Sequence, residues 1–349
     1  VWVCGRGGQG SGRLGHSLRL SVPKPWLFQH LLSAVGTSHE NLKLYPLDLN
    51  SDDGWDAAMA GCQYVLHVAS PISLDDQNED YFVKPAVAGV KRALKFAKKY
   101  NINKVVLTSS VAAIFDTMEK KNHFDESDWS DPNNPAISHY SKSKTLAEMA
   151  AWDYVKNEGN PFDLAVINPA LVTGPTLTGD LGESNKAVQM VAGGKMPVAV
   201  PLMFGYVDVR DVASAHILAM ENPASNGERF ALAEKDLWYK DVAKLLKDNG
   251  FEKAPSIAIP VWLAKILAKF NKELKLTLPY LGRLRSVQKT SKAKDVLGWN
   301  PRPAEESILE VNCIRSSFGE SVTLESLSNS SSLSSRPRNP SHPRVPRQP

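Results

Sequence analysis

Residues 104–110, Lys-Val-Val-Leu-Thr-Ser-Ser, constrain the fold of this chain more than any other stretch. Residues 105–107 are apolar without alternation, which is typical of a strand covered on both faces of a parallel sheet. The sequence therefore predicts an α/β fold. Because the strand ends in hydroxyl side chains, Ser110 is expected at the carboxyl end of the sheet, where ligands of open α/β sheets bind.

A tyrosine and a lysine follow at positions 140 and 144, in a segment that is predicted to open a helix. Residues four apart lie one above the other on a helix, so this phenol and ammonium point to one place. Because a free phenol has a pKa near ~10, we expect the Lys144 cation, together with an oxidised nicotinamide, to lower the Tyr140 pKa. We predict that Tyr140 gives a proton to a carbonyl that receives hydride, that Lys144 also hydrogen-bonds the cofactor ribose, and that Ser110 orients the carbonyl.

The Tyr-x-x-x-Lys spacing alone is a weak signal. The chain has nine tyrosines, and with ordinary lysine usage roughly even odds of a chance match are expected. Tyr100 and Lys104 have the same spacing, but they immediately precede the strand at 105–107 and so lie at the amino edge of the sheet. Tyr100 and Lys104 are therefore excluded as the catalytic pair by their place at the amino edge, and Tyr140 remains the candidate.

Four segments resemble the extended short-chain dehydrogenase/reductases, and within them the dihydroflavonol reductases, cinnamoyl-CoA reductases and microbial ketone and aldehyde reductases. These segments are 105–110 (VVLTSS), 124–130 (FDESDWS), 140–148 (YSKSKTLAE) and 167–175 (INPALVTGP). The likeness extends over residues 27–309. It implies a Rossmann-like doubly wound parallel sheet with a smaller C-terminal substrate lobe, and NADP as the cofactor, with NAD as the alternative.

The resemblance also implies a domain organisation. It gives a Rossmann-like dinucleotide-binding domain over residues 1–170, of which 1–25 are atypical, and a substrate-binding lobe over residues 171–310, interleaved with the first. From Glu310 the likeness ends. The composition that follows is rich in Ser, Pro and Arg, which predicts a disordered tail over 311–349.

The glycine-rich segment near the start departs from the family pattern. Gly5 and Gly8 match it, and their backbone amides would approach a pyrophosphate, but the third glycine position is Ser11. Residues 11–22 are too few to supply both the helix and the strand that follow in the family. Our hypothesis is that the first ~25 residues are altered relative to the ancestral fold. Gly5 and Gly8 remain candidate cofactor contacts.

Further cofactor contacts are implied by the resemblance at the ends of successive strands, in addition to Tyr140 and Lys144. They are Asp48 and Leu49 near the adenine, Val68, Ala69 and Ser70 beneath the cofactor, Pro169 and Val172 over the nicotinamide, and Ser184. For Asp48, a turn residue or helix cap is the structural alternative.

The substrate side of the site is less marked in the sequence. Dihydroflavonol reductases carry an asparagine five residues beyond the serine, where it contacts flavonoid hydroxyls, but here that position is Phe115. This argues against a flavonoid and for a more apolar carbonyl compound, with Phe115 and Phe204 as candidate pocket residues. Residues 176–204 are expected to form a mobile loop on the substrate side. Asp211 is expected to cap a helix, and His67 to be a core histidine.

Composition excludes several other classes of protein. Among 349 residues there is no apolar run near ~18 residues, which argues against a membrane span. Net charge is +4, but the segment from 311 holds five arginines against two glutamates, so the folded part is near neutral and no nucleic-acid partner is expected. The start lacks the pattern of a signal peptide, and the three scattered cysteines favour a reducing compartment without disulfides. We therefore expect a cytoplasmic monomer or homodimer that acts on a small-molecule carbonyl compound, without a metal or a membrane partner.

Two alternative functions stay open. A sugar-nucleotide epimerase or dehydratase uses the same Ser, Tyr and Lys, but it needs basic contacts to a diphosphate in the substrate lobe. A non-catalytic dinucleotide-binding relative is the other alternative, because the glycine-rich segment is disrupted while the three residues of the site are intact.

Overall fold

The computed structural model describes residues 18–22, 42–72, 78–117, 121–176, 181–271, 274–275, 277–287, 291–315 and 321–323. A parallel sheet of four strands forms its centre, in the order β3 (Tyr64–His67), β4 (Lys104–Thr108), β5 (Asp163–Pro169) and β8 (Arg229–Leu232). The apolar run at 105–107 is a central strand of this sheet, as predicted. The predicted α/β fold is therefore confirmed.

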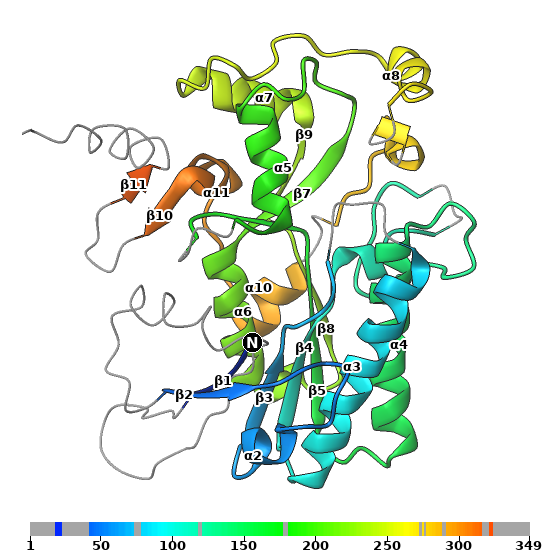
Figure 1. Ribbon diagram of the computed structural model, residues 1–349, viewed down its shortest axis with the longest axis vertical. Coiled ribbons are helices and arrows are strands. Elements are labelled where there is room, and N and C mark those ends of the chain that lie inside the picture. Colours follow the sequence, from blue (N-terminus) through cyan, green and yellow to red (C-terminus); the bar gives the residue numbers. More distant parts are fainter. Residues whose placement is uncertain are drawn as a thin grey trace, which may run out of the picture.

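Helices cover both faces of this sheet (Figure 1). One layer consists of α2 (Trp55–Met59), α3 (Glu79–Lys99) and α4 (His139–Asn157), and the other of α6 (Val209–Glu221) and α10 (Ser291–Leu297). The pleat of β4 divides its side chains between the layers: Val105 and Leu107 pack into the first core, and Val106 into the second. A run without alternation is therefore buried throughout.

Capping side chains fix where the two long helices begin. The Asn78 side chain accepts a hydrogen bond from the backbone N–H of Tyr81 at 2.9 Å, which caps α3. The Ser138 hydroxyl oxygen accepts from the backbone N–H of Ser141 at 3.0 Å, which caps α4. Because α4 begins at His139, Tyr140 lies in its first turn.

A smaller lobe is built around a second sheet. In it, β7 (Met203–Asp208) pairs parallel with β6 (Leu171–Thr173) and antiparallel with β9 (Lys235–Trp238). Its helices are α5 (Gly182–Ala192), α7 (Tyr239–Asp248), α8 (Val261–Leu267) and α11 (Ala304–Leu309). Since α6, β8 and α10 return to the central sheet, the chain passes back and forth between the two parts (Figure 1).

The remaining elements are short. They are the 3-10 helices η2 (Val111–Ala113), η3 (Pro223–Ser225), η4 (Leu278–Tyr280) and η5 (Glu310–Asn312), the parallel pair β1 (Leu18–Val22) and β2 (Leu42–Pro46), and the antiparallel pair β10 (Cys313–Arg315) and β11 (Ser321–Thr323). Strand β1 shows that the residues before 23 supply a strand. Gly5 and Gly8 lie outside the described residues.

Two expectations about the smaller lobe are wrong. The segment 176–204, expected to be a loop, contains the eleven-residue helix α5, because Val188 and Val191 are buried against the core of the lobe. The cap of α6 is Asp208, whose carboxylate accepts from the backbone N–H of Arg210 at 2.7 Å. Asp211 lies one turn further on, because β7 leads directly into the helix.

The boundary of the expected disordered tail also needs correction. Val311 is 1% exposed and packs in the core of the smaller lobe, and residues 313–315 pair with residues 321–323. Val311 continues the buried stripe of Ala304 and Ile308 at helical spacing, which a boundary drawn from composition overlooks. Residues 324–349 lie outside the described residues.

Two observations bear on the expected compartment. Cys62 is disulfide-bonded, so the expectation that no cysteine pairs is wrong and the cysteines no longer favour a reducing compartment. No helix within the described ranges has the length and apolarity that a bilayer crossing requires.

The packing around β8 predicts that removing its buried phenylalanine ring strongly lowers the free energy of unfolding. Phe230 is fully buried between β8 and the layer of α6 and α10, so Phe230→Ala should lower the free energy of unfolding by about 3–5 kcal/mol. Phe270→Ala makes the same change where the ring is 86% exposed, and it should cost less than about 0.5 kcal/mol. Urea denaturation of both variants measures the difference, and equal losses would contradict the prediction.

Candidate active site

Ser110 lies directly beyond the carboxyl end of β4. Its side chain is buried, and its hydroxyl oxygen accepts a hydrogen bond from the backbone N–H of Ala112 at 3.2 Å, which caps η2. The carbonyl oxygen of Pro169, at the end of the neighbouring β5, is 3.4 Å from this hydroxyl. The hydroxyl therefore stands between the ends of two adjacent strands.

Tyr140 and Lys144 approach Ser110 from the first two turns of α4. The Tyr140 phenol is hydrogen-bonded to the Ser110 side chain. The Lys144 ammonium is buried and lies 5.9 Å from the centroid of the Tyr140 ring, which Phe82 of α3 contacts edge-on at 6.4 Å between centroids. The structure thus brings the three predicted residues together; their catalytic roles stay predictions.

The pKa of Tyr140 departs from its ordinary value in the direction opposite to the expectation. Burial raises the pKa of the phenol, and the hydrogen bond with Ser110 lowers it by less. In this arrangement the cost of removing a phenolate from water exceeds the stabilisation by Ser110, whereas the lowering expected from Lys144 together with an oxidised nicotinamide stays a prediction. The phenol is therefore neutral at neutral pH and carries the proton that a donor needs.

Two buried basic groups, Lys144 and His67, interact electrostatically with each other. Burial lowers the pKa of Lys144 to about 8, while the carboxylate of Glu148 opposes this effect. Burial also lowers the pKa of His67 at the end of β3 to about 3, and the charge of Lys144 acts in the same direction. Near neutral pH the lysine is charged and the histidine is neutral.

The residues expected to contact the cofactor lie where the parallel strands end. Val68, Ala69 and Ser70 directly follow β3, and Val68 is 40% exposed, an apolar side chain left open at the edge of the sheet. Pro169 ends β5, Val172 lies on β6, and Ser184 is in the first turn of α5. The exposed Val68 side chain and the buried Lys144 ammonium could contact, respectively, the apolar face and the polar groups of a dinucleotide. Among the described residues, no cluster of His, Cys, Asp or Glu is suited to a metal ion.

Asp48 and Leu49 follow β2 and make local contacts. The Asp48 carboxylate accepts hydrogen bonds from the backbone N–H of Asn50 at 2.7 Å and from its side chain at 3.1 Å. Asp48 thus has the role of a turn residue, the structural alternative to a cofactor contact. Leu49 packs over Gly89, where an added Cβ would meet it at 3.2 Å.

Phe115 and Phe204, the candidate pocket residues, lie in different hydrophobic clusters. The guanidinium of Arg285 stacks on the Phe115 ring at 4.3 Å and on the Tyr280 ring at 4.0 Å, and it forms an ion pair with Asp116 at 2.6 Å. The Phe204 ring contacts Tyr239 at 5.5 Å between centroids. One face of Phe115 is thus covered by a cation from the smaller lobe, which no local sequence signal predicts.

A buried polar group next to the three residues was also missed. The Glu148 carboxylate is 1% exposed and contacts Arg229 of β8 at 2.5 Å and Asn168 of β5 at 2.8 Å. The sequence could have indicated Glu148, because it continues the spacing of four residues between Tyr140 and Lys144 and so lies on the same helix face. Its partners come from strands that are distant in sequence.

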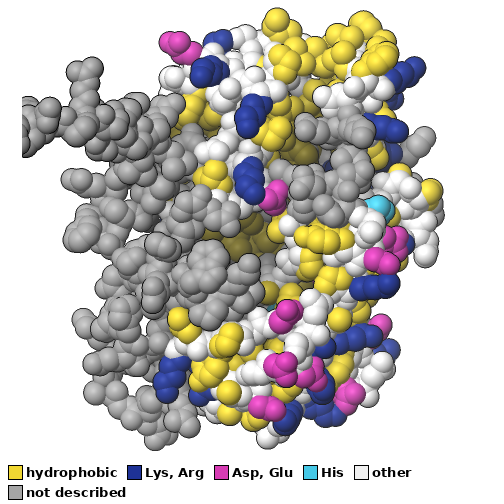
Figure 2. All heavy atoms as spheres, viewed as in Figure 1, with side chains coloured by type: hydrophobic (Ala, Val, Ile, Leu, Met, Phe, Trp, Pro, Cys, Tyr) yellow, Lys and Arg dark blue, Asp and Glu magenta, His cyan; other side chains and the backbone are white. Residues whose placement is uncertain are grey.

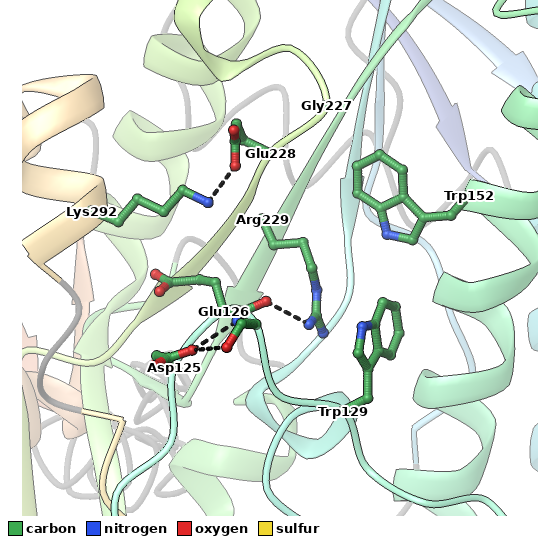
Figure 3. A pocket seen from close by; sticks show the side chains of 9 residues that line it. Asp125, Glu126, Trp129, Trp152, Gly227, Glu228, Arg229 and Lys292 are labelled. Carbon is green, nitrogen blue, oxygen red and sulfur yellow. Dashed lines mark hydrogen bonds and ion pairs between the residues drawn. The ribbon is translucent and has the colours of Figure 1, made fainter.

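Arg229 also forms a wall of a pocket of about 490 Å³ beside β8. Figure 3 shows its guanidinium between the main chain at Glu126 and the Trp129 ring, with Trp152 on the same side. The ring centroid of Trp129 is 3.8 Å from the guanidinium carbon.

A doubly wound parallel sheet with a Ser, Tyr and Lys at its carboxyl edge defines a dinucleotide-dependent protein of the short-chain dehydrogenase type. The chain belongs to the NAD dependent epimerase/dehydratase family, which matches residues 19–233. The resemblance drawn from the sequence motifs is thereby confirmed.

Three similar proteins are reductases. Cinnamoyl-CoA reductase CAD2 of Medicago truncatula is 35% identical over 259 residues, which cover 70% of this chain and 76% of that protein. Dihydroflavonol 4-reductase of Gerbera hybrida is 33% identical over 230 residues, 63% of this chain and 62% of that protein. The crystal structure of the yeast methylglyoxal/isovaleraldehyde reductase Gre2 complexed with NADPH has a TM-score of 0.67 at 26% identity, covering 85% of this chain and 90% of that one. These relatives confirm the predicted class, an oxidoreductase.

The lowered pKa of His67 predicts an acid-sensitive fold. Between pH 6.5 and about 3 the unfolded chain binds a proton at residue 67 that the folded chain excludes, so stability falls as the pH falls through this window. His67→Asn should flatten the pH dependence of the unfolding free energy there, by up to about 1.4 kcal/mol per pH unit. Urea denaturation at a series of pH values measures it. An unchanged slope in His67→Asn would contradict the prediction.

Proposed function

We propose that this chain is an NADPH-dependent carbonyl reductase that acts on a small ketone or aldehyde. The observation that carries the proposal is the convergence of Ser110, Tyr140 and Lys144 at the carboxyl edge of the parallel sheet. The choice of NADPH is supported by the yeast relative Gre2, which is named an NADPH-dependent methylglyoxal reductase and whose crystal structure contains NADPH.

The bound cofactor would supply the hydride, which adds to the carbonyl carbon. The Ser110 hydroxyl holds the carbonyl oxygen and orients it toward the phenol. The neutral Tyr140 phenol gives its proton to this oxygen as negative charge develops there, so the product is an alcohol and the phenol regains a proton from solvent. The Lys144 ammonium stabilises the phenolate that remains.

Cofactor binding would use groups at the ends of several strands. Lys144 would bond a ribose hydroxyl, residues 68–70 would lie beneath the cofactor, and Pro169 with Val172 would cover the nicotinamide. The Asp48–Leu49 turn would lie near the adenine, and Ser184 would make a further contact with the cofactor. Gly5 and Gly8 keep their proposed part in phosphate binding.

We assign residues 1–170 to the dinucleotide-binding domain and 171–310, interleaved with it, to the substrate lobe. The two larger sheets, one of four strands and one of three, support this division. Phe115 and Phe204 would face the substrate from the two sides, which favours an apolar carbonyl compound over a flavonoid. The cytoplasm and a monomer or homodimer remain our expectation.

Replacing the proton donor tests the mechanism. Tyr140→Phe should lower kcat by a factor on the order of 10²–10⁴, because the phenol supplies the proton in the transition state. Tyr100→Phe is the matched control: Tyr100 has the same Tyr-x-x-x-Lys spacing, but its hydroxyl bonds Asp56 at 2.8 Å, away from the three residues of the site. NADPH oxidation with a panel of ketones and aldehydes measures both. Wild-type turnover in Tyr140→Phe would refute the mechanism.

Ligand binding separates this proposal from the two alternatives. Quenching of tryptophan fluorescence by NADPH should saturate well below a millimolar concentration if the chain binds the cofactor as proposed. Turnover of carbonyl compounds without binding of any nucleotide sugar would exclude the epimerase or dehydratase. Binding of NADPH without turnover of any carbonyl compound would favour the non-catalytic relative.

A further inference from the structure

Glu148 is the third member of a stripe on α4 that begins with Tyr140 and Lys144. Its carboxylate is almost completely removed from water, which is costly unless hydrogen-bond donors replace the water. Three donors do so: Arg229 Nε at 2.5 Å, Asn168 Nδ2 at 2.8 Å and Trp152 Nε1 at 3.4 Å. The carboxylate is therefore held in one place from three directions.

Asn168 connects this carboxylate to the main chain of the catalytic serine. It is fully buried on β5, and its Nδ2 donates both to Glu148 and to the carbonyl oxygen of Ser110, at 3.1 Å. One amide group thus bridges α4 and the residue that caps η2. A shift of the carboxylate would be transmitted to the backbone that carries the Ser110 hydroxyl.

Arg229 fixes the carboxylate from the opposite side. Its Nη1 donates to the carbonyl oxygens of Glu126 at 2.9 Å and Asp128 at 2.7 Å, and its planar group stacks on Trp129 (Figure 3). A planar guanidinium with several fixed donors suits this multiple contact better than a lysine would. Arg229 also balances the charge of Glu148, so the pair is buried without a net charge.

The groups around the Lys144 ammonium come from several elements. Tyr140 and Glu148 share its helix, His67 approaches from β3, and Arg229 lies behind Glu148 on β8. Glu148 is the anionic group among them. Its carboxylate raises the Lys144 pKa against the effect of burial, so it favours the ammonium form near neutral pH.

We propose that Glu148, held by Arg229 and Asn168, is a positioning residue for carbonyl reduction that fixes the backbone of Ser110 and keeps Lys144 charged. The inference rests on the proposed function, because it gives Glu148 a part in that reaction. It acts through Ser110 and Lys144 and touches neither substrate nor cofactor.

Two substitutions separate charge from geometry. Glu148→Gln keeps the shape and an acceptor oxygen but removes the charge, so the fall of kcat toward high pH should move to lower pH. Glu148→Asp keeps the charge but withdraws it by one methylene, so kcat should fall by a factor on the order of 10–100 with a smaller shift in pH. An unmoved pH profile in Glu148→Gln would overturn the charge role, and wild-type kcat in Glu148→Asp would overturn the positioning role.

The control removes the charge of another buried carboxylate that an arginine contacts. Asp211 is 5% exposed and accepts from the backbone N–H of Arg302 at 2.8 Å, far along the chain from the stripe on α4. Asp211→Asn should lower the thermal midpoint as the Glu148 variants do, but leave the pH profile of kcat in place. A shift equal to that of Glu148→Gln would overturn the proposal.

A readout that is independent of turnover keeps this inference separate from the proposed function. Competitive acetylation of Lys144 with acetic anhydride across pH, read by mass spectrometry, should have a midpoint near pH 8 in the wild type and a lower one in Glu148→Gln. Glu148→Asp should lie between them and decides the question if Glu148→Gln does not fold. Equal midpoints in the wild type and the variants refute the inference, whereas absent turnover with shifted midpoints refutes only the proposed reaction.

Discussion

The Lys144 ammonium is buried, and the free energy lost by removing its charge from water must be offset by nearby groups of opposite charge. Burial favours its neutral form, while the nearby Glu148 carboxylate favours the charged one. The carboxylate is buried too and needs its own cation, Arg229, which lies on the edge strand of the sheet. The charges therefore alternate from the interior of the site to its outer wall.

This alternation links the chemistry to the fold. The lysine and glutamate come from one helix, but the arginine comes from β8, which enters the sheet only after the chain has passed through the smaller lobe. Asn168 on β5 completes the connection to Ser110. The site is thus assembled only when the central sheet has all four of its strands, so Arg229, late in the sequence, lies beside the earlier helix that carries Tyr140 and Lys144.

Local rules predicted the elements that bear the site. The apolar run at 105–107 identified a central strand, and a spacing of four identified the helix face of Tyr140 and Lys144. The same rules failed where burial depends on distant partners. The helix α5 is stabilised by packing in the smaller lobe, and Val311 extends a stripe across a boundary that composition alone had suggested.

Long-range contacts also limit what a sequence says about the substrate. The family resemblance predicted an apolar pocket wall at Phe115, but Arg285, 170 residues further along the chain, stacks on that ring while it pairs with Asp116. The guanidinium covers one face of the ring and leaves less of it for an apolar contact, while Asp116 balances its charge. Because stacking orients the guanidinium and the ion pair fixes it, the surroundings of the Phe115 ring are set by tertiary structure and not by any local stretch of sequence.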